Sequence, residues 1–217
     1  MKCVLFLFVF NLSFNTSYPQ SSKVGLSHYL FPKFNQGVIL LKSGIKNQAL
    51  LNYNSLTEEM IFENNGKKLA IAKGELELVD TVFIEGRKFI ALNNTFFELV
   101  YHSKSDLYVE HKCSIIAPGK PTAYGGTSET SSITSLSSIN SGGKLYELEL
   151  PEGYIIKPYT FYWLKKNGEL NKFINLKQLM KLYDYKKDLF KAYVKKYDVR
   201  YDNQESMVQL IKYLETN

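Results

Sequence analysis

Short apolar stretches separated by turn residues run through most of this chain, from about residue 38 to residue 174. Stretches of this length that are rich in β-branched and aromatic residues predict β-strands. Several are joined by dipeptides that favour two-residue hairpin turns, such as Glu85-Gly86, Asn93-Asn94 and Asn167-Gly168. A tight turn makes its two strands antiparallel, because a parallel crossover needs a dozen or more residues. The pattern therefore predicts an antiparallel meander.

The turns also predict which residues lie opposite one another. The Glu85-Gly86 turn places Val82 opposite Phe89, and the Asn167-Gly168 turn places Trp163 opposite Lys172 and Tyr162 opposite Phe173. A loop at residues 103–106 would place His111 opposite Glu98. These pairs are specific expectations about the register of the sheet.

The period of the apolar positions changes at Asn175. Asn175 followed by Gln178 is a capping-box-like start, and it predicts a helix through about Tyr183. Apolar residues then recur three and four positions apart, which places them on one side of a helix. The second helix carries Phe190, Tyr193, Val194 and Tyr197, and the third, opened by Asp202 and Glu205, carries Met207, Leu210, Ile211 and Leu214. We expect residues 175–217 to form a cap of three short helices.

These patterns predict a mainly β (α+β) fold. More than ten strands in one open sheet are unusual, because accumulated twist makes such a sheet curl or split. We therefore expect the meander to form a barrel-like or two-sheet core over residues 37–174, with the helices covering a sheet edge or an open end. An extended leader at residues 18–36 precedes this domain. Within the β domain, residues 125–143 are rich in Ser and Thr, and we expect a mobile loop there.

The amino-terminal residues have the layout of a secretory signal peptide: Lys2, an apolar run over residues 3–10, and then a polar stretch. Asn11 and Ser13 interrupt the run well before the roughly 20 apolar residues that a spanning helix needs. We expect residues 1–17 to be removed and the mature protein to have no transmembrane segment. The expected location is periplasmic or secreted.

Charge and cysteine content add little more. The full chain has a net charge of +6, which the loss of Lys2 would lower by one. A mildly basic surface suits anionic partners or simply keeps a β-rich surface soluble, and export makes nucleic acid the least expected partner. Cys3 lies in the predicted signal peptide, so Cys113 would be alone and no intramolecular disulfide is expected.

Three groups of short strings carry a resemblance. They are Ala49-Leu50-Leu51-Asn52-Tyr53-Asn54 with Met60 and Phe62 downstream, Val82-Phe83-Ile84 leading to Arg87-Lys88-Phe89, and Tyr193-Val194-Lys195-Lys196-Tyr197-Asp198 before Leu210-Ile211-Lys212-Tyr213-Leu214. In these strings the chain resembles a broad, uncharacterised group of exported β-rich proteins of Gram-negative bacteria with a helical tail. The resemblance implies an envelope or secreted protein, and it implies no activity.

Few residues have the spacing that a catalytic or metal-binding site requires. His111, oriented by Glu98, lies two residues before Cys113, so a hydrolase with Cys113 as its nucleophile is one alternative. The carboxylate pairs Glu75/Glu77 and Glu147/Glu149, each expected on one strand face, would suit a glycosidase, although the solvated face of a half-buried strand also explains them. No H-x-x-x-H or C-x-x-C cluster occurs in the sequence. We assign no catalytic residue, metal site or cofactor.

The strand before Asn167 supplies the candidate binding residues. Its aromatic side chains would stack on sugar rings or bases beside two cations, although packing in the core is the preferred explanation of these aromatic residues. The candidates are Phe161, Tyr162, Trp163, Lys165 and Lys166. We expect an exported, non-catalytic protein that binds a macromolecular partner, such as an envelope protein or a glycan, or a small apolar ligand. The alternatives are a secreted hydrolase and a peripheral binder of anionic membranes through the basic stretch after Asn175.

Overall fold

The computed structural model describes residues 28–116, 120–121, 127–128 and 155–217. Several predicted features lie outside the described residues. These are the signal peptide at residues 1–17, the leader up to residue 27, the loop at residues 125–143 except for Thr127 and Ser128, and the strand that carries Glu147 and Glu149.

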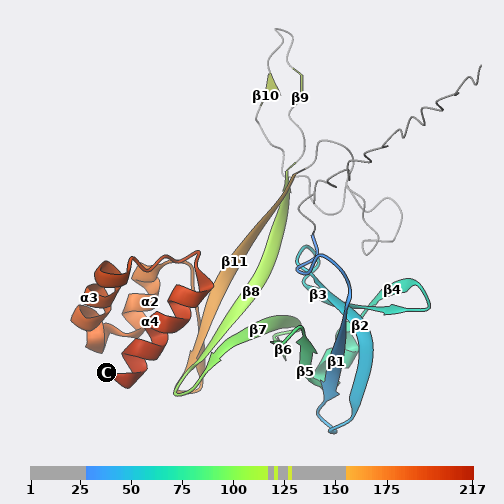
Figure 1. Cartoon of the computed structure of the whole chain (residues 1–217), viewed down its shortest axis with the longest axis horizontal. Helices are drawn as coiled ribbons and strands as arrows, with labels where there is room; N and C mark the ends of the chain where they lie inside the picture. Colours follow the sequence, from blue (N-terminus) through green and yellow to red (C-terminus); the bar gives the residue numbers. More distant parts are fainter. Residues whose placement is uncertain (1–27, 117–119, 122–126, 129–154) are drawn as a thin grey trace, which may run out of the picture.

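Ten strands form one antiparallel sheet (Figure 1), which confirms a mainly β fold with a meander. The strands are β1 (Asn35–Leu41), β2 (Lys46–Asn54), β3 (Glu59–Asn64), β4 (Lys67–Ala70), β5 (Val79–Ile84), β6 (Arg87–Leu92), β7 (Thr95–His102), β8 (Asp106–Ile116), β11 (Ile155–Lys166) and β12 (Glu169–Phe173). Their order across the sheet is β12-β11-β8-β7-β6-β5-β1-β2-β3-β4. A 3-10 helix, η1 (Lys73–Leu78), connects β4 to β5, and β9 (Lys120–Pro121) pairs with β10 (Thr127–Ser128) in a separate ribbon.

Two-residue turns join four of the hairpins. In each turn both central residues have a positive φ, which matches the right-handed twist of the flanking strands. The turns are Asn65-Gly66, Glu85-Gly86, Asn93-Asn94 and Asn167-Gly168. The predicted pairs are confirmed: Val82 lies opposite Phe89, Tyr162 opposite Phe173, and Trp163 opposite Lys172.

The predicted register between β7 and β8 is wrong by two residues. Glu98 lies opposite Val109 instead of His111. The loop is shorter than expected, because His102 already pairs with Asp106, and the register shifts again at a bulge between Leu99 and Tyr101. A bulge adds an unpaired residue to one strand, and the alternation of apolar and polar residues does not predict where a bulge occurs.

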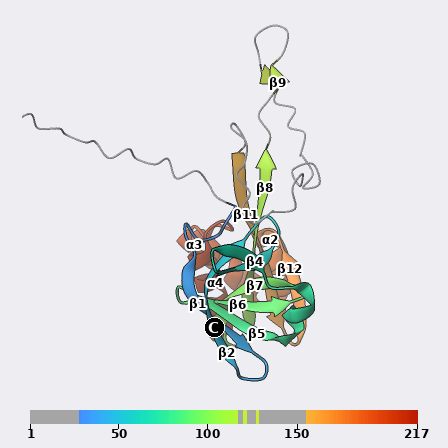
Figure 2. The same cartoon turned by 90° about the vertical axis from the view of Figure 1, so that its right-hand side faces the viewer.

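The expected barrel-like or two-sheet core is also wrong, because the ten strands remain one open sheet with β4 and β12 at its edges. The accumulated twist bends the sheet but does not split it in two (Figures 1 and 2). We call the bent part, formed by β1 to β7, the curl. The curl brings the β2–β3 turn against β8, where the Cys113 amide donates to the Ser55 carbonyl at 3.0 Å. Gly37 permits the close packing of the curled strands, since a Cβ there would lie 2.6 Å from the Phe83 carbonyl oxygen.

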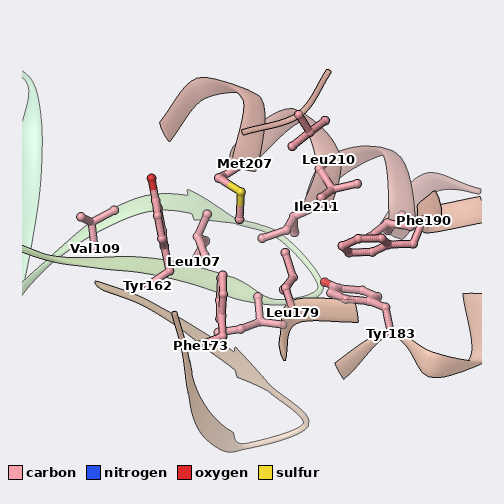
Figure 3. Close-up of a cluster of buried hydrophobic side chains, with 13 residues drawn as sticks. Leu107, Val109, Tyr162, Phe173, Leu179, Tyr183, Phe190, Met207, Leu210 and Ile211 are labelled. Atoms are coloured by element: carbon pink, nitrogen blue, oxygen red, sulfur yellow. The ribbon is translucent and has the colours of Figure 1, made fainter. Parts of the chain in front are cut away.

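The carboxyl-terminal tail is helical, as predicted. It contains α2 (Leu176–Leu182), η3 (Asp184–Lys186), α3 (Lys187–Tyr197) and α4 (Gln204–Thr216). The Asn175 side chain caps α2 by accepting from the Gln178 amide at 2.9 Å. Asn203 caps α4 in the same way, one residue after the predicted start at Asp202. The helices cover a face of the sheet, not an edge, and their apolar side chains meet those of β8 and β11 (Figure 3).

The sheet therefore has two hydrophobic cores on the same face. One core lies inside the curl of β1 to β7 and includes Leu51, Tyr53, Met60 and Phe89. The other core lies between β8, β11, β12 and the helices. A single row of paired residues crosses both cores, and it runs Ile39, Val82, Phe89, Glu98, Val109, Tyr162 and Phe173. Glu98 is the only charged member of this row.

The helical cap should contribute strongly to stability. We predict that Leu210→Ala, at a side chain that is 0% exposed, lowers the free energy of unfolding by about 2–5 kcal/mol, because it leaves a cavity between α4 and the sheet. Urea unfolding followed by circular dichroism measures this change. Lys212→Ala, at an exposed position of the same helix, should change the free energy by less than about 0.5 kcal/mol. An equal effect of the two substitutions would contradict the described packing.

Candidate functional site

The curl leaves an apolar groove at its mouth. The groove has a volume of about 530 Å³, within the range of small-molecule sites. Its apolar walls are formed by Ile39, Leu41, Ala49, Phe62, Ile71, Leu78 and Val79. Polar side chains, among them Asn47, Gln48, Glu63 and Asn64, also line it. Apolar side chains form the larger part of its lining.

The alternation of the strands explains these walls. Ile39 and Leu41 are two residues apart on β1, so both point into the curl. Ala49, on β2 opposite Gly37, fills little of the space in front of it. Leu78, at the end of η1, is 60% exposed. The curl therefore leaves part of its apolar lining accessible.

An ionic cluster lies deeper on the same face, between the two cores. The Arg87 guanidinium donates to both carboxylate oxygens of Glu98, with Nε to Oε1 at 2.7 Å and Nη2 to Oε2 at 2.6 Å. His111 Nε2 lies 2.7 Å from Glu98 Oε2 and 3.1 Å from Arg87 Nη2. The expected contact between His111 and Glu98 is therefore present despite the shifted register.

Aromatic rings surround this cluster. The Arg87 guanidinium carbon lies 5.0 Å from the centre of the Phe31 ring and 5.6 Å from that of Phe89. Burial alone would raise the pKa of Glu98, but the hydrogen bonds from Arg87 and His111 outweigh it and lower this pKa to about 2. Glu98 is thus held as a carboxylate within the core.

The structure gives Cys113 no features of a nucleophile. Its side chain is buried, and burial, with a smaller effect of Glu58, raises the pKa of the thiol to about 11. The reactive form of cysteine is the thiolate, which this environment disfavours. His111 shares the strand face of Cys113, but its Nε2 is engaged by Glu98 and Arg87.

The carboxylate pair Glu75/Glu77 does not lie on a strand face as expected. Both residues belong to η1, and both side chains are exposed. The alternation of Glu and Leu there resembles a strand, but the segment must cross from β4 at one edge of the sheet to β5, so it forms a tight helical turn. Glu147 and Glu149 lie outside the described residues.

The aromatic binding candidates are divided between the two faces of β11, as alternation predicts. Tyr162 is buried in the core beneath the helices, where its ring stacks on that of Phe173. On the other face, Trp163 Nε1 donates to Glu110 at 2.8 Å. The Lys172 ammonium lies 3.8 Å from the centre of the Phe161 ring and so covers part of this aromatic surface.

The two lysine candidates have different surroundings. Lys165 is exposed. Lys166 donates to the Leu182 carbonyl at 3.2 Å, and its ammonium lies 4.0 Å from the centre of the Tyr183 ring. Lys166 therefore holds the end of α2 against the sheet. The five candidates do not form one continuous patch.

The basic stretch after Asn175 is distributed over the helices. Lys187, Lys191 and Lys195 are exposed and four residues apart, so they form one line along α3. Acidic residues, among them Asp184 and Asp188, are interspersed with them. This line of lysines is the feature of the helices that would contact an anionic membrane surface in the peripheral-binder hypothesis.

Comparisons with protein-family models, with curated proteins and with solved structures find no match. Among the described residues, no helix is long and apolar enough to cross a membrane. The same part of the chain holds no group of three or more His, Cys, Asp or Glu side chains that would bind a metal ion. The hollows and side-chain clusters of the structure are therefore what indicates a function.

The ionic cluster predicts a pH dependence of stability. Because the pKa of Glu98 is lowered from 4.5 to about 2 on folding, its contribution is complete above about pH 4.5 and is lost as the pH falls towards 2. This contribution is on the order of 3 kcal/mol. The difference in unfolding free energy between the wild type and Glu98→Gln should therefore shrink over this interval, as measured by urea unfolding at each pH. The exposed Glu205→Gln should show no such trend, and a constant difference for Glu98→Gln would contradict the assignment.

Cys113 should react slowly with thiol reagents. We predict that iodoacetamide at pH 8 leaves the native protein largely unmodified, because the side chain is buried and its thiol pKa is raised to about 11. Mass spectrometry after alkylation measures the modified fraction, with the protein unfolded in urea as the control for full reaction. Rapid alkylation of the native protein would restore the cysteine hydrolase as a hypothesis.

Proposed function

We propose that this chain is an exported, non-catalytic binding protein, and that the groove at the mouth of the curl holds a small apolar ligand. The groove carries this proposal. It is concave, its volume of about 530 Å³ suits a small molecule, and apolar side chains from β1, β2, β3 and η1 converge on it.

Accessible apolar walls support a ligand in this place. Hydrophobic surface that stays in contact with water loses the free energy of burial, about 25 cal/mol per Å² of apolar area. Ile39, Leu41 and Phe62 are only half-buried, and Leu78 is largely exposed. A ligand in the groove would bury all four.

Export is a part of the proposal that depends on the sequence alone. Lys2 followed by the apolar run over residues 3–10 is typical of a signal peptide. We therefore place the mature protein in the periplasm or outside the cell, as the resemblance to exported proteins of Gram-negative bacteria also implies.

The other functions have weaker support. A cysteine hydrolase would need an activated Cys113, whose thiol pKa is raised. In the Glu75/Glu77 pair, which lies on a helical turn, only Glu75 lines the groove. A glycan or protein partner on the outer face of β11 would have to displace Lys172 from the Phe161 ring. The line of lysines on α3 favours an anionic surface but has no apolar hollow of comparable size beside it among the described residues.

Filling the groove should weaken ligand binding. We predict that Ala49→Trp weakens the binding of Nile red, an uncharged apolar dye, by about tenfold or more, or about 1.4 kcal/mol, because the indole occupies the space of the ligand. Fluorescence titration of the mature protein gives the affinity. Ala192→Trp, at an exposed position of α3, is the matched control and should bind the dye as the wild type does. Equal dye binding by the two variants, with folding checked by circular dichroism, would show that the groove is not the site.

A further inference from the structure

The charged residues that line the apolar groove all have the same sign. Of the described residues in its lining, Glu63 of β3 and Glu75 of η1 are the two that carry a charge. The amide side chains of Asn47, Gln48 and Asn64 form the rest of the polar lining. The described lining therefore contains two carboxylates and no cation.

The geometry of η1 places Glu75 at the groove and the neighbouring lysine on the other side. In a 3-10 helix, residues three positions apart lie on the same side. Glu75 and Leu78 line the groove, whereas Lys73 and Leu76 line a separate hollow of about 250 Å³. Glu75 is exposed, and no ion pair joins it to another described residue. Its carboxylate is thus accessible to a ligand.

The lysine opposite Glu63 is engaged elsewhere. Lys68 pairs with Glu63 in the register of β3 and β4. Its ammonium, however, lies 5.5 Å from the centre of the Phe34 ring and 5.9 Å from that of Tyr29, and no ion pair joins it to Glu63. Lys68 therefore interacts with the leader and leaves the Glu63 carboxylate without a salt bridge among the described residues.

Other lysines of the neighbouring strands do not line the groove. Lys46 lies opposite Leu40, which alternates with the groove residue Ile39, so Lys46 belongs to the outer face of the sheet. Lys67 lies opposite Asn64 on the edge strand and is exposed, but it is not part of the lining. The groove thus presents negative charge beside its apolar walls.

This arrangement discriminates between ligands by charge. A carboxylate attracts an ammonium group and repels another carboxylate, and an exposed pair of opposite charges changes an affinity by a few-fold. Because Glu75 is exposed and Glu63 half-buried, an ammonium group beside them keeps part of its hydration and avoids the cost of a buried charge. An anionic ligand would instead add a third negative charge at the same place.

We propose that the ligand of the groove is a cationic amphiphile, with its apolar chain against the walls and its ammonium group beside Glu75 and Glu63. This inference rests on the proposed function, since it names the class of ligand for the same groove. It assigns the affinity for the chain to apolar walls such as Ile39 and Phe62, and the preference for positive charge to the two carboxylates.

Three competitors of Nile red with the same chain length test the charge preference: decylammonium, 1-decanol and decanoate, each below the concentration at which it forms micelles. At pH 7 we expect decylammonium to bind the wild-type protein about tenfold more tightly than decanoate, with 1-decanol between them. Added salt should reduce this ratio, because it screens exposed charges. Equal binding of decylammonium and decanoate, or tighter binding of decanoate, would overturn the inference.

Substitution of the two carboxylates tests the position of the ammonium group. Glu75→Gln and Glu63→Gln should each lower the ratio of the decylammonium and decanoate affinities about threefold and leave the affinity for 1-decanol unchanged. Glu77→Gln is the matched control, because Glu77 is exposed on the same η1 but lines neither hollow. An equal effect of Glu77→Gln would show a long-range effect of net charge and contradict a site beside Glu75.

The two proposals fail in different ways. If the dye binds the wild type and is lost in Ala49→Trp, but the three competitors show no charge preference or do not displace it, the inference fails and the proposed function stands. If the dye binds the wild type and Ala49→Trp equally, or binds neither, both fail.

Discussion

The partly buried ion pair between Arg87 and Glu98 joins the two halves of this molecule. Glu98 occupies the one charged position in a row of paired residues that is otherwise apolar, at the boundary between the core inside the curl and the core under the helices. An unpaired carboxylate there would be strongly destabilising, and removing one partner of a buried pair typically costs 3–5 kcal/mol. Arg87 also lies against Phe31 and Phe89. The pair thus fixes the leader, β6 and β7 relative to one another, and His111 adds β8.

This junction separates two differently shaped parts of the sheet. The sheet curls around one core on the N-terminal side of the ion pair, and the helices pack on it over the other core on the C-terminal side. The contacts of the β2–β3 turn with β8, through Ser55 and Glu58, hold the curl in place. The helices fill the other half of the same face, where Met207, Leu210, Ile211 and Leu214 are fully buried. One face of one sheet therefore has a packed part and a hollow part.

The sequence predicted what local patterns determine. The dipeptides Glu85-Gly86, Asn93-Asn94 and Asn167-Gly168 have the positive φ angles that hairpin turns require, and the periodic apolar residues of α4 are buried as expected. The barrel-like core and the β7–β8 register were wrong because they depend on the pairing of β1 with β5, over forty residues apart, and on a bulge. Neither feature has a local signature. The small residues Gly37 and Ala49 were the available signals for close packing and for the groove, and their meaning depends on the curl.

The buried carboxylates of the described residues are all engaged in contacts within the protein. A catalytic site needs polar groups that face a cleft and remain free to meet a substrate. The buried carboxylates described here are engaged inside the protein: Glu98 by Arg87 and His111, Glu110 by Trp163 and Lys172, and Glu215 by Tyr101 and Ser105. The groove at η1 instead has walls that are mainly apolar. These carboxylates thus stabilise the fold, whereas the groove at η1 is lined mainly by apolar side chains.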